Sequence, residues 1–321
     1  MPRKQTAQPY HLFVLMLAMI LATTAVSKEL TPIKVGIDLW PGYYPVVIAK
    51  EKGWFRENGL AVEYFLPENT DKMLQDFVNG ETQVICVALG DVFALTEKLP
   101  GLRVPMISDE SAGGDALISL KPLPDSLKGL KIGTNLNGFG ELFVTEFLRQ
   151  HNTNPKDIIL VHQEASRASH LLSTGKVDIA HSWEPYVSEA SAYYNAQVVF
   201  SSAATPGLIP DAVVFHPDLI AQPAAAKAFV KTWLKAAEWW LGHRHDGNRI
   251  AERNLLLMPN TVNLEGIKLM TTEGNRTLFA APEEITSLYQ VTSLYIDFFR
   301  SKGVITKPLA AKDVITPEFL P

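Results

Sequence analysis

The sequence predicts an α/β protein built from two lobes. The chain has 321 residues, which is enough for two ordinary domains. Residues 34–65 follow the pattern strand, turn, helix, turn, strand, which is typical of parallel strands joined by a right-handed crossover. The same pattern restarts near residue 130 and runs to residue 161. Each repeat predicts a sheet of its own, so we expect two Rossmann-like α/β lobes with a hinged cleft between them.

The first repeat has clear boundaries. Residues 33–39 are β-branched and alternating, which indicates a strand, and residues 60–65 indicate a second one. Pro45 stands where a helix would begin, because proline lacks the N–H that has no partner there. Gly53 stands where that helix should end.

Aromatic residues gather on the turn that follows the first strand. Trp40, Tyr43 and Tyr44 flank Pro41-Gly42, at the carboxyl end of the strand. Ligands of open α/β sheets bind at that edge, so Trp40 and Tyr43 are candidate ligand-binding residues. Ordinary core packing is the alternative, and for Tyr44 the two interpretations are evenly balanced.

Composition excludes some partners. The formal charge of −5 would become −7 after removal of residues 1–27, which contain Arg3 and Lys4 and no acid. Nucleic acid is a poor fit to this charge, because phosphate binding requires a basic face. The single cysteine, Cys86, excludes a disulfide within the chain and indicates a small buried side chain.

The N-terminus predicts export. Two basic residues precede an uncharged apolar run over residues 12–21, and small residues follow to Ser27. This is the plan of a secretory signal peptide, so we expect residues 1–27 to be cleaved and the protein to lie in the periplasm. An uncleaved membrane anchor is the alternative.

Several candidate residues stand at strand or helix ends. A helix is expected over residues 70–78, a strand over 83–89 and a helix from Gly90 to Leu95. Asp91 opens that helix, where it could cap the helix, contact a ligand or do both. Strands are expected at 104–107, 116–120, 130–134 and 158–161, with an acidic loop over 108–115.

A glycine-rich turn opens the helix predicted over residues 141–150. Gly138-Phe-Gly140 suggests dinucleotide binding, but Phe143 occupies the third glycine position, which excludes it. Free N–H groups at a helix start can bind an anion, so Asn137 and Gly138 are candidate ligand-binding residues; a plain tight turn is the alternative.

Further on, Trp183-Glu184-Pro185 follows a strand predicted at 178–181. Trp183 could stack on a ligand and Glu184 could pair with a cation; packing of the ring on Pro185 is the alternative.

Two aspartates enter similar apolar strands. Asp115 precedes residues 116–120 and Asp211 precedes 212–216, and these strands flank the second repeat. If both strands cross between lobes, both carboxylates face the cleft; simple strand termination is the alternative. The expected division is lobe 1 over 28–118 plus 213–321 and lobe 2 over 119–212. Helices are expected at 224–241, with Phe229, Trp233 and Trp240 in the core, and at 247–257, 263–270 and 282–301.

These motifs, in this order, resemble the solute-binding proteins of ABC importers for nitrate, sulfonates, taurine and thiamine precursors. That family shares its fold with the NMT1/THI5-like proteins. The resemblance covers the aromatic Pro-Gly turn and several later motifs: Asn79-Gly80-Glu81, Gly113-Gly114-Asp115, Leu127 to Gly133, Gly175 to Asp178, Trp183-Glu-Pro185 and Pro210-Asp211. It implies the type II periplasmic-binding-protein fold, with the Trp-Glu-Pro loop at the lobe interface.

The resemblance predicts a monomeric binding protein that delivers a small molecule to the permease subunits of an ABC importer, without enzymatic activity or cofactor. Four carboxylates in one desolvated cleft would repel one another unless a cation joined them. We therefore expect a cationic or zwitterionic nitrogen compound, held by Asp91, Asp115, Glu184 and Asp211, rather than nitrate or a simple sulfonate. No metal site is expected. An enzyme on the same fold and a sensor subunit of a membrane receptor remain alternatives.

Overall fold

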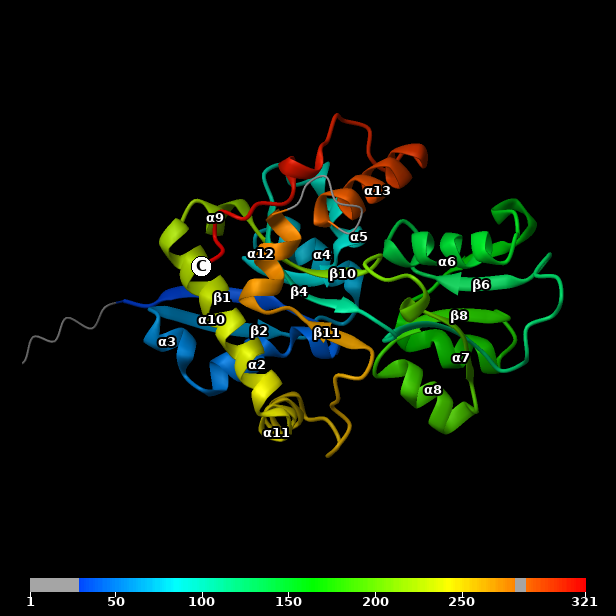
Figure 1. Ribbon diagram of the computed structural model, residues 1–321, viewed down its shortest axis with the longest axis horizontal. Coiled ribbons are helices and arrows are strands. Elements are labelled where there is room, and N and C mark those ends of the chain that lie inside the picture. Colours follow the sequence, from blue (N-terminus) through cyan, green and yellow to red (C-terminus); the bar gives the residue numbers. More distant parts are fainter. Residues whose placement is uncertain (1–28, 281–286) are drawn as a thin grey trace, which may run out of the picture. The chain divides into compact units, whose positions relative to one another are not determined.

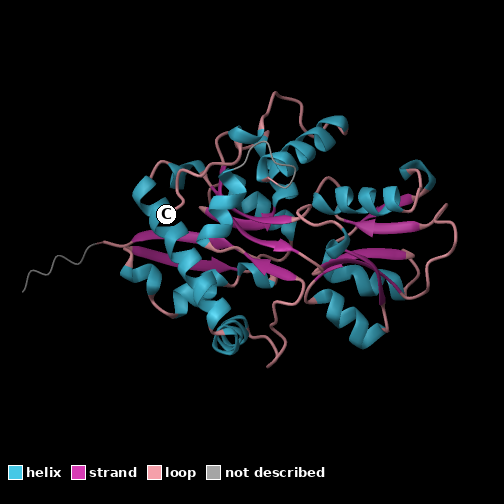
Figure 2. Cartoon of the chain, viewed as in Figure 1, coloured by secondary structure: helices cyan, strands magenta, loops and turns pink. Residues whose placement is uncertain are grey.

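Two mixed β-sheets, each covered by helices, carry the fold (Figures 1 and 2). The computed structural model describes residues 29–280 and 287–321, and residues 31–321 form one compact unit. The predicted signal peptide, residues 1–27, lies outside the described residues. Among the helices of the described part, none is long and apolar enough to cross a membrane.

The larger sheet has six strands in the order β11-β4-β10-β3-β1-β2. Strands β1, β2 and β3 are parallel, whereas β10 is antiparallel to both β3 and β4, and β11 is antiparallel to β4. The strands span β1 (Thr31–Gly36), β2 (Leu60–Phe65), β3 (Val84–Ala88), β4 (Arg103–Ser111), β10 (Pro210–Phe215) and β11 (Ile267–Leu269).

The second sheet has five strands in the order β7-β6-β8-β5-β9. Strands β7, β6 and β8 are parallel, and β5 is antiparallel to β8 and to β9. The strands span β5 (Asp115–Ser119), β6 (Lys131–Thr134), β7 (Ile159–His162), β8 (Ile179–Trp183) and β9 (Gln197–Ser201).

Helices connect the strands of both sheets. They are α2 (Pro45–Glu51), α3 (Trp54–Glu57), α4 (Thr70–Val78), α5 (Leu89–Thr96), α6 (Phe139–Gln150), α7 (Ala168–Ser173), α8 (Tyr186–Tyr194), α9 (Pro217–Ile220), α10 (Pro223–Gly242), α11 (Arg244–Leu255), α12 (Thr272–Ala280) and α13 (Leu288–Ser301). Five short 3-10 turns are η1 (Pro41–Tyr43), η2 (Pro155–Asp157), η3 (Ala165–Arg167), η4 (Ser202–Ala204) and η5 (Ala311–Asp313).

Most predicted elements are present, although residues 282–286 of the helix expected at 282–301 lie outside the described residues. The strand expected at 33–39 ends at Gly36, and three further elements differ more. The strand expected at 104–107 continues to Ser111, because β10 and β11 pair with its second half. Part of the expected acidic loop is therefore strand. The helix expected at 263–270 is wrong: this segment contains β11, which pairs with β4. Strand β8 runs on to Trp183, so Trp183 belongs to a strand and not to a loop.

The two strands expected to cross between lobes do not cross. Asp115 pairs with Trp183 inside the five-stranded sheet, and Asp211 pairs with Ala88 inside the six-stranded sheet. The chain passes between the sheets just before β5 and just before β10, at residues 112–114 and 202–209. The lobe boundaries given above remain a prediction.

The core is aromatic and continues across both sheets. Helix α10 buries Phe229, Trp233 and Trp240 against the six-stranded sheet, as the sequence predicts. A second cluster joins α5 and α13 to α6, and includes Phe93 and Phe143. Because each fully buried aromatic side chain stabilises a fold by about 1.5–3 kcal/mol, this cluster holds α6 firmly against α5 and α13.

Candidate functional site

Sheet polarity brings distant acidic residues to one place. The parallel strands β1 and β3 end at the edge of the six-stranded sheet where the antiparallel strand β10 begins. In the other sheet, β8 ends opposite the start of β5. Residues that follow a parallel strand therefore meet residues that open an antiparallel one.

One cavity collects these ends. Its lining comprises Asp38, Trp40, Tyr43, Thr70, Val87, Ala88, Asp91, Asp115, Phe139, Trp183 and Asp211. We call this the acidic cavity. It brings together six of the nine predicted site residues: Trp40, Tyr43, Asp91, Asp115, Trp183 and Asp211.

The acidic cavity has carboxylates and no basic lining residue among the residues described. Asp91, Asp115 and Asp211 are each at most 5% exposed. Burial, opposed by a hydrogen bond from the Trp40 N–H, raises the pKa of Asp38 to about 7. Burial likewise raises the pKa of Asp91 to about 7. The cavity is thus a place where a positive charge is favoured and further negative charge is not.

Asp211 is the most constrained of these acids. The Tyr43 hydroxyl donates to its Oδ1 at 2.5 Å, whereas its Oδ2 is buried and has no hydrogen-bond partner within the described residues. Burial and the neighbouring Asp109 carboxylate raise the pKa of Asp211 well above its usual value. Oδ2 therefore carries the proton of the neutral acid or, when Asp211 is ionised, is a buried acceptor without a partner; the latter costs about 1–3 kcal/mol and favours a ligand N–H at Oδ2.

Asp109 lies next to the Tyr43–Asp211 pair. It accepts hydrogen bonds from the Trp40 Nε1–H at 2.9 Å and from the Ser108 hydroxyl at 2.7 Å. Gly42 makes the approach possible, because a Cβ there would lie 1.9 Å from Asp109 Oδ2. The Pro-Gly turn thus brings the Trp40 indole over a buried carboxylate, and that contact fixes the ring as a cavity wall.

The start of α6 already has acidic partners. The Phe139 N–H donates to Asp91 Oδ1 at 3.1 Å, and the Asn137 N–H donates to Glu141 Oε2 at 3.0 Å. Asp91 therefore caps α6 and not its own helix. Asn137 and Gly138 line an adjoining cavity of about 750 Å³, which they share with Asp91. Two carboxylates at this helix start disfavour an anionic ligand there.

Asp115 has a histidine partner that the sequence did not reveal. His181 Nε2 lies 3.3 Å from Asp115 Oδ1, and its Nδ1 lies 3.3 Å from Thr134 Oγ1. The imidazole is 2% exposed and contacts the rings of Phe139 and Trp183, which themselves line the cavity. His181 thus helps to position the Asp115 carboxylate and the rings of Phe139 and Trp183.

Glu184 lies apart from the other predicted residues. It does not line the acidic cavity; its carboxylate accepts hydrogen bonds from the N–H and the hydroxyl of Ser188 at the start of α8. Burial raises the pKa of Glu184. The local role of Glu184 is therefore to cap α8.

Among the polar and aromatic residues of the site and its support, sequence reasoning missed five: Asp38, Thr70, Asp109, Phe139 and His181. Asp38 carried a usable signal, because it lies two residues after β1 and two residues before Trp40. Asp109 carried none, because it lies inside a long strand and its contact with Trp40 joins positions 69 apart in the chain.

Comparison with known proteins agrees with this architecture. The chain aligns with a putative aliphatic sulfonates-binding protein of Bacillus subtilis strain 168 at 25% identity, over 91% of this chain and 88% of that protein. It aligns with a putative thiamine biosynthesis protein of Haemophilus influenzae strain Rd at 27% identity over 172 residues. That alignment covers 52% of this chain and 54% of the relative, so the chain matches only about half of the latter's length.

A solved structure has the same fold. The periplasmic nitrate-binding protein NrtA from Synechocystis PCC 6803 superposes with a TM-score of 0.73, at 14% identity, over 91% of this chain and 87% of that chain. The fold is therefore that of the type II periplasmic binding proteins, as the sequence predicts. The sequence model of the NMT1/THI5-like proteins matches residues 40–246, and the chain belongs to this family.

Proposed function

We propose that this protein is the periplasmic solute-binding subunit of an ABC importer and that it binds a small cationic or zwitterionic nitrogen compound in the acidic cavity. Ligands of this class include amines, amidines and aminopyrimidines. The observation that carries the proposal is the unpartnered, buried Asp211 Oδ2 in a cavity whose lining contains acids and no base.

The acidic cavity encloses only about 20 Å³ in this structure, so a ligand larger than water enters when the lobes part. Its walls then suit a flat or compact cation. Trp40 and Trp183 offer aromatic faces, on which a ligand cation is held by attraction to the ring electrons. Asp115 and Asp211 enter from different sheets, so a ligand between them contacts both lobes. Such bridging contacts favour closure of the lobes over the ligand.

An oxyanion ligand has less support. No lysine or arginine lines the acidic cavity in the described part of the chain, and two amides at the start of α6 already donate to carboxylates. A nitrate or sulfonate would therefore meet acidic groups and no cation, and would disfavour ionisation of those acids. The sulfonate and nitrate specificity of the relatives is not carried over to this chain.

The proposal also includes export, a monomeric state and permease partners. One alternative is an enzyme of the same fold that converts a small metabolite. The other is a sensor subunit that signals to a membrane receptor whether the ligand is bound. Sequencing the N-terminus of periplasmic protein tests export, and assays of candidate compounds for turnover test the enzymatic alternative.

The deciding experiment is a thermal-shift screen of the purified protein with small amines, amidines and aminopyrimidines, beside nitrate and short alkanesulfonates. A compound that binds only the folded protein raises the melting temperature in proportion to RT ln(1 + [L]/Kd). Stabilisation by a cation, confirmed by calorimetric titration, supports the proposal. Stabilisation by nitrate or a sulfonate alone contradicts it.

A further inference from the structure

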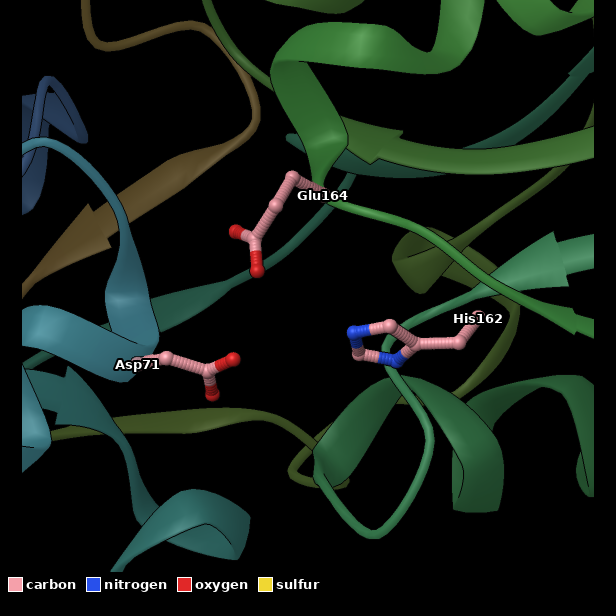
Figure 3. A group of neighbouring side chains, drawn as sticks. All are labelled: Asp71, His162 and Glu164. Atoms are coloured by element: carbon pink, nitrogen blue, oxygen red, sulfur yellow. The ribbon is translucent and has the colours of Figure 1, made fainter.

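A second group of polar side chains lies outside the acidic cavity. Asp71 is the second residue of α4, His162 is the last residue of β7, and Glu164 follows two residues later. One ligating atom from each residue lies within 4.8 Å of the other two. Figure 3 shows the three side chains pointing into a common space from different segments of the chain.

Neighbouring groups hold two of these side chains in place. The Leu136 N–H lies 3.3 Å from His162 Nδ1, which turns Nε2 of the ring toward the two carboxylates. Thr70, next to Asp71, is a polar neighbour of the Glu164 carboxylate. A metal-bound histidine needs an acceptor at its other ring nitrogen, so the Leu136 contact orients only the metal-free ring and is given up when Nε2 binds an ion.

Within the described residues, no lysine or arginine pairs with the two carboxylates of this group. Neither Asp71 nor Glu164 forms an ion pair with a lysine or arginine among the residues described. Burial and the Asp71 carboxylate raise the pKa of Glu164, and His162 opposes that rise. Two carboxylates that face each other at this distance repel unless a cation joins them.

We propose that Asp71, His162 and Glu164 bind a divalent transition-metal ion, for which Zn²⁺ is the best match. One imidazole and two carboxylates form a three-ligand set that Zn²⁺ accepts, with water in the fourth position. Mg²⁺ and Ca²⁺ fit less well, because they prefer ligand shells made of oxygen.

Small side-chain movements complete the site. Zn–N and Zn–O bonds of about 2.0–2.2 Å require ligand atoms roughly 3.4 Å apart, so the group must contract by up to about 1.4 Å. Asp71 and His162 are exposed and can rotate to do so. The imidazole must then carry its proton on Nδ1, at the expense of the long contact with Leu136, so we expect affinity in the micromolar range.

The ion would link the two halves of the fold. Asp71 belongs to the helix after β2 of the six-stranded sheet, and His162 and Glu164 follow β7 of the five-stranded sheet. A bound ion therefore fixes the spacing of these segments beside the 750 Å³ cavity, which both Asp71 and His162 line. This inference does not depend on the ligand of the acidic cavity.

Calorimetric titration of the metal-free protein with ZnCl₂ tests the proposal. We expect one Zn²⁺ per chain, with affinity about tenfold or more weaker in His162→Ala and in Glu164→Gln. Co²⁺ should give the visible absorption of a histidine-ligated ion in the wild type, and that absorption should be lost in His162→Ala. Mg²⁺ should not bind measurably.

His170→Ala is the matched control, because His170 is also exposed and lies on α7 of the same sheet region. It should bind Zn²⁺ with wild-type affinity. No Zn²⁺ binding by the wild type would overturn the proposal. Equal affinity in wild type and His162→Ala, or an equal loss in His170→Ala, would also overturn it.

Discussion

Tyr43 and Asp211 are joined by a buried hydrogen bond in which the phenol donates to one carboxylate oxygen; the other oxygen has no partner in the part of the chain that the structure describes. The two residues are 168 positions apart in the chain. Tyr43 lies on the turn after β1, and Asp211 is the second residue of β10. This bond orients the carboxylate so that its other oxygen is available to a ligand. The first three predictions below concern this carboxylate and the acids around it.

The first prediction concerns Asp211→Asn. The amide keeps the shape of the side chain and removes the charge that a cationic ligand would pair with. We expect ligand affinity to fall by about 2–5 kcal/mol, the cost of leaving one charge of a buried pair uncompensated. Titration calorimetry with a compound from the screen measures this.

Glu184→Gln is the comparison variant, since Glu184 was also predicted to bind the ligand but caps α8. We expect it to retain affinity close to wild type. Loss of affinity in Glu184→Gln alone would place the ligand near α8, whereas wild-type affinity in both variants would remove the acidic cavity as the binding site.

The second prediction concerns pH. Burial raises the pKa values of Asp38, Asp91 and Asp109 to about 7, far above their usual value of 3.8. The folded protein therefore binds more protons than the unfolded chain between about pH 4 and pH 7. Stability from these groups is largest at low pH and is lost as pH rises through about 7.

A cationic ligand should show the opposite trend. Its affinity should increase from pH 6 to pH 8, and binding near pH 7 should release protons. Titrations in buffers of different ionisation enthalpy count those protons, and urea unfolding of the ligand-free protein at the same pH values measures stability. Affinity that falls with rising pH would indicate an anionic ligand.

The third prediction concerns His181. Replacement by alanine leaves Asp115 and Thr134 without this side-chain partner and opens space among Phe139 and Trp183. We expect a loss of stability of about 1–3 kcal/mol from the unpaired buried acceptor, plus weaker ligand binding. His181→Gln keeps a hydrogen-bond donor and should recover part of both. Equal effects of the two variants would show that the ring itself, and not its hydrogen bond, is required.

The sequence predicted those residues of the site that lie at the ends of strands. Trp40, Tyr43 and Asp91 follow parallel strands and Asp211 opens an antiparallel one, so local patterns were enough to find them. The sequence did not predict Asp109, because its importance comes from β10, whose residues lie about a hundred positions away. Glu184 was predicted to bind the ligand, but its carboxylate accepts hydrogen bonds from Ser188.

The fold shows the same division between local and distant causes. Turn residues and β-branched runs predicted β2 and α4 to the residue. The short strand β11 was predicted as helix, because its three residues form a strand only through pairing with β4. Pairing between distant segments also decides which sheet receives β5 and β10, and local patterns cannot supply that information.

The last prediction concerns the contact of α5 with α6. A Cβ at Gly90 would lie 2.6 Å from Phe139 Cβ and 2.8 Å from Phe139 Cα. The second of these atoms is backbone, so the two helices must separate to admit even a methyl group. We expect Gly90→Ala to destabilise the protein by about 1–3 kcal/mol, as overpacking of a tight core does.

Gly90→Ala should also weaken ligand binding, because Asp91 and Phe139 both line the acidic cavity and meet at this contact. Gly242→Ala is the matched control at the end of α10, where an added Cβ would have no neighbour within 4 Å. That variant should keep wild-type affinity and be no less stable, since alanine favours the helix over glycine. Urea unfolding and calorimetry of the two variants separate the outcomes. A Gly90→Ala protein as stable as wild type would contradict a tight contact between α5 and α6. It would mean that the two helices move apart at little cost in free energy, as they must if the cleft opens easily.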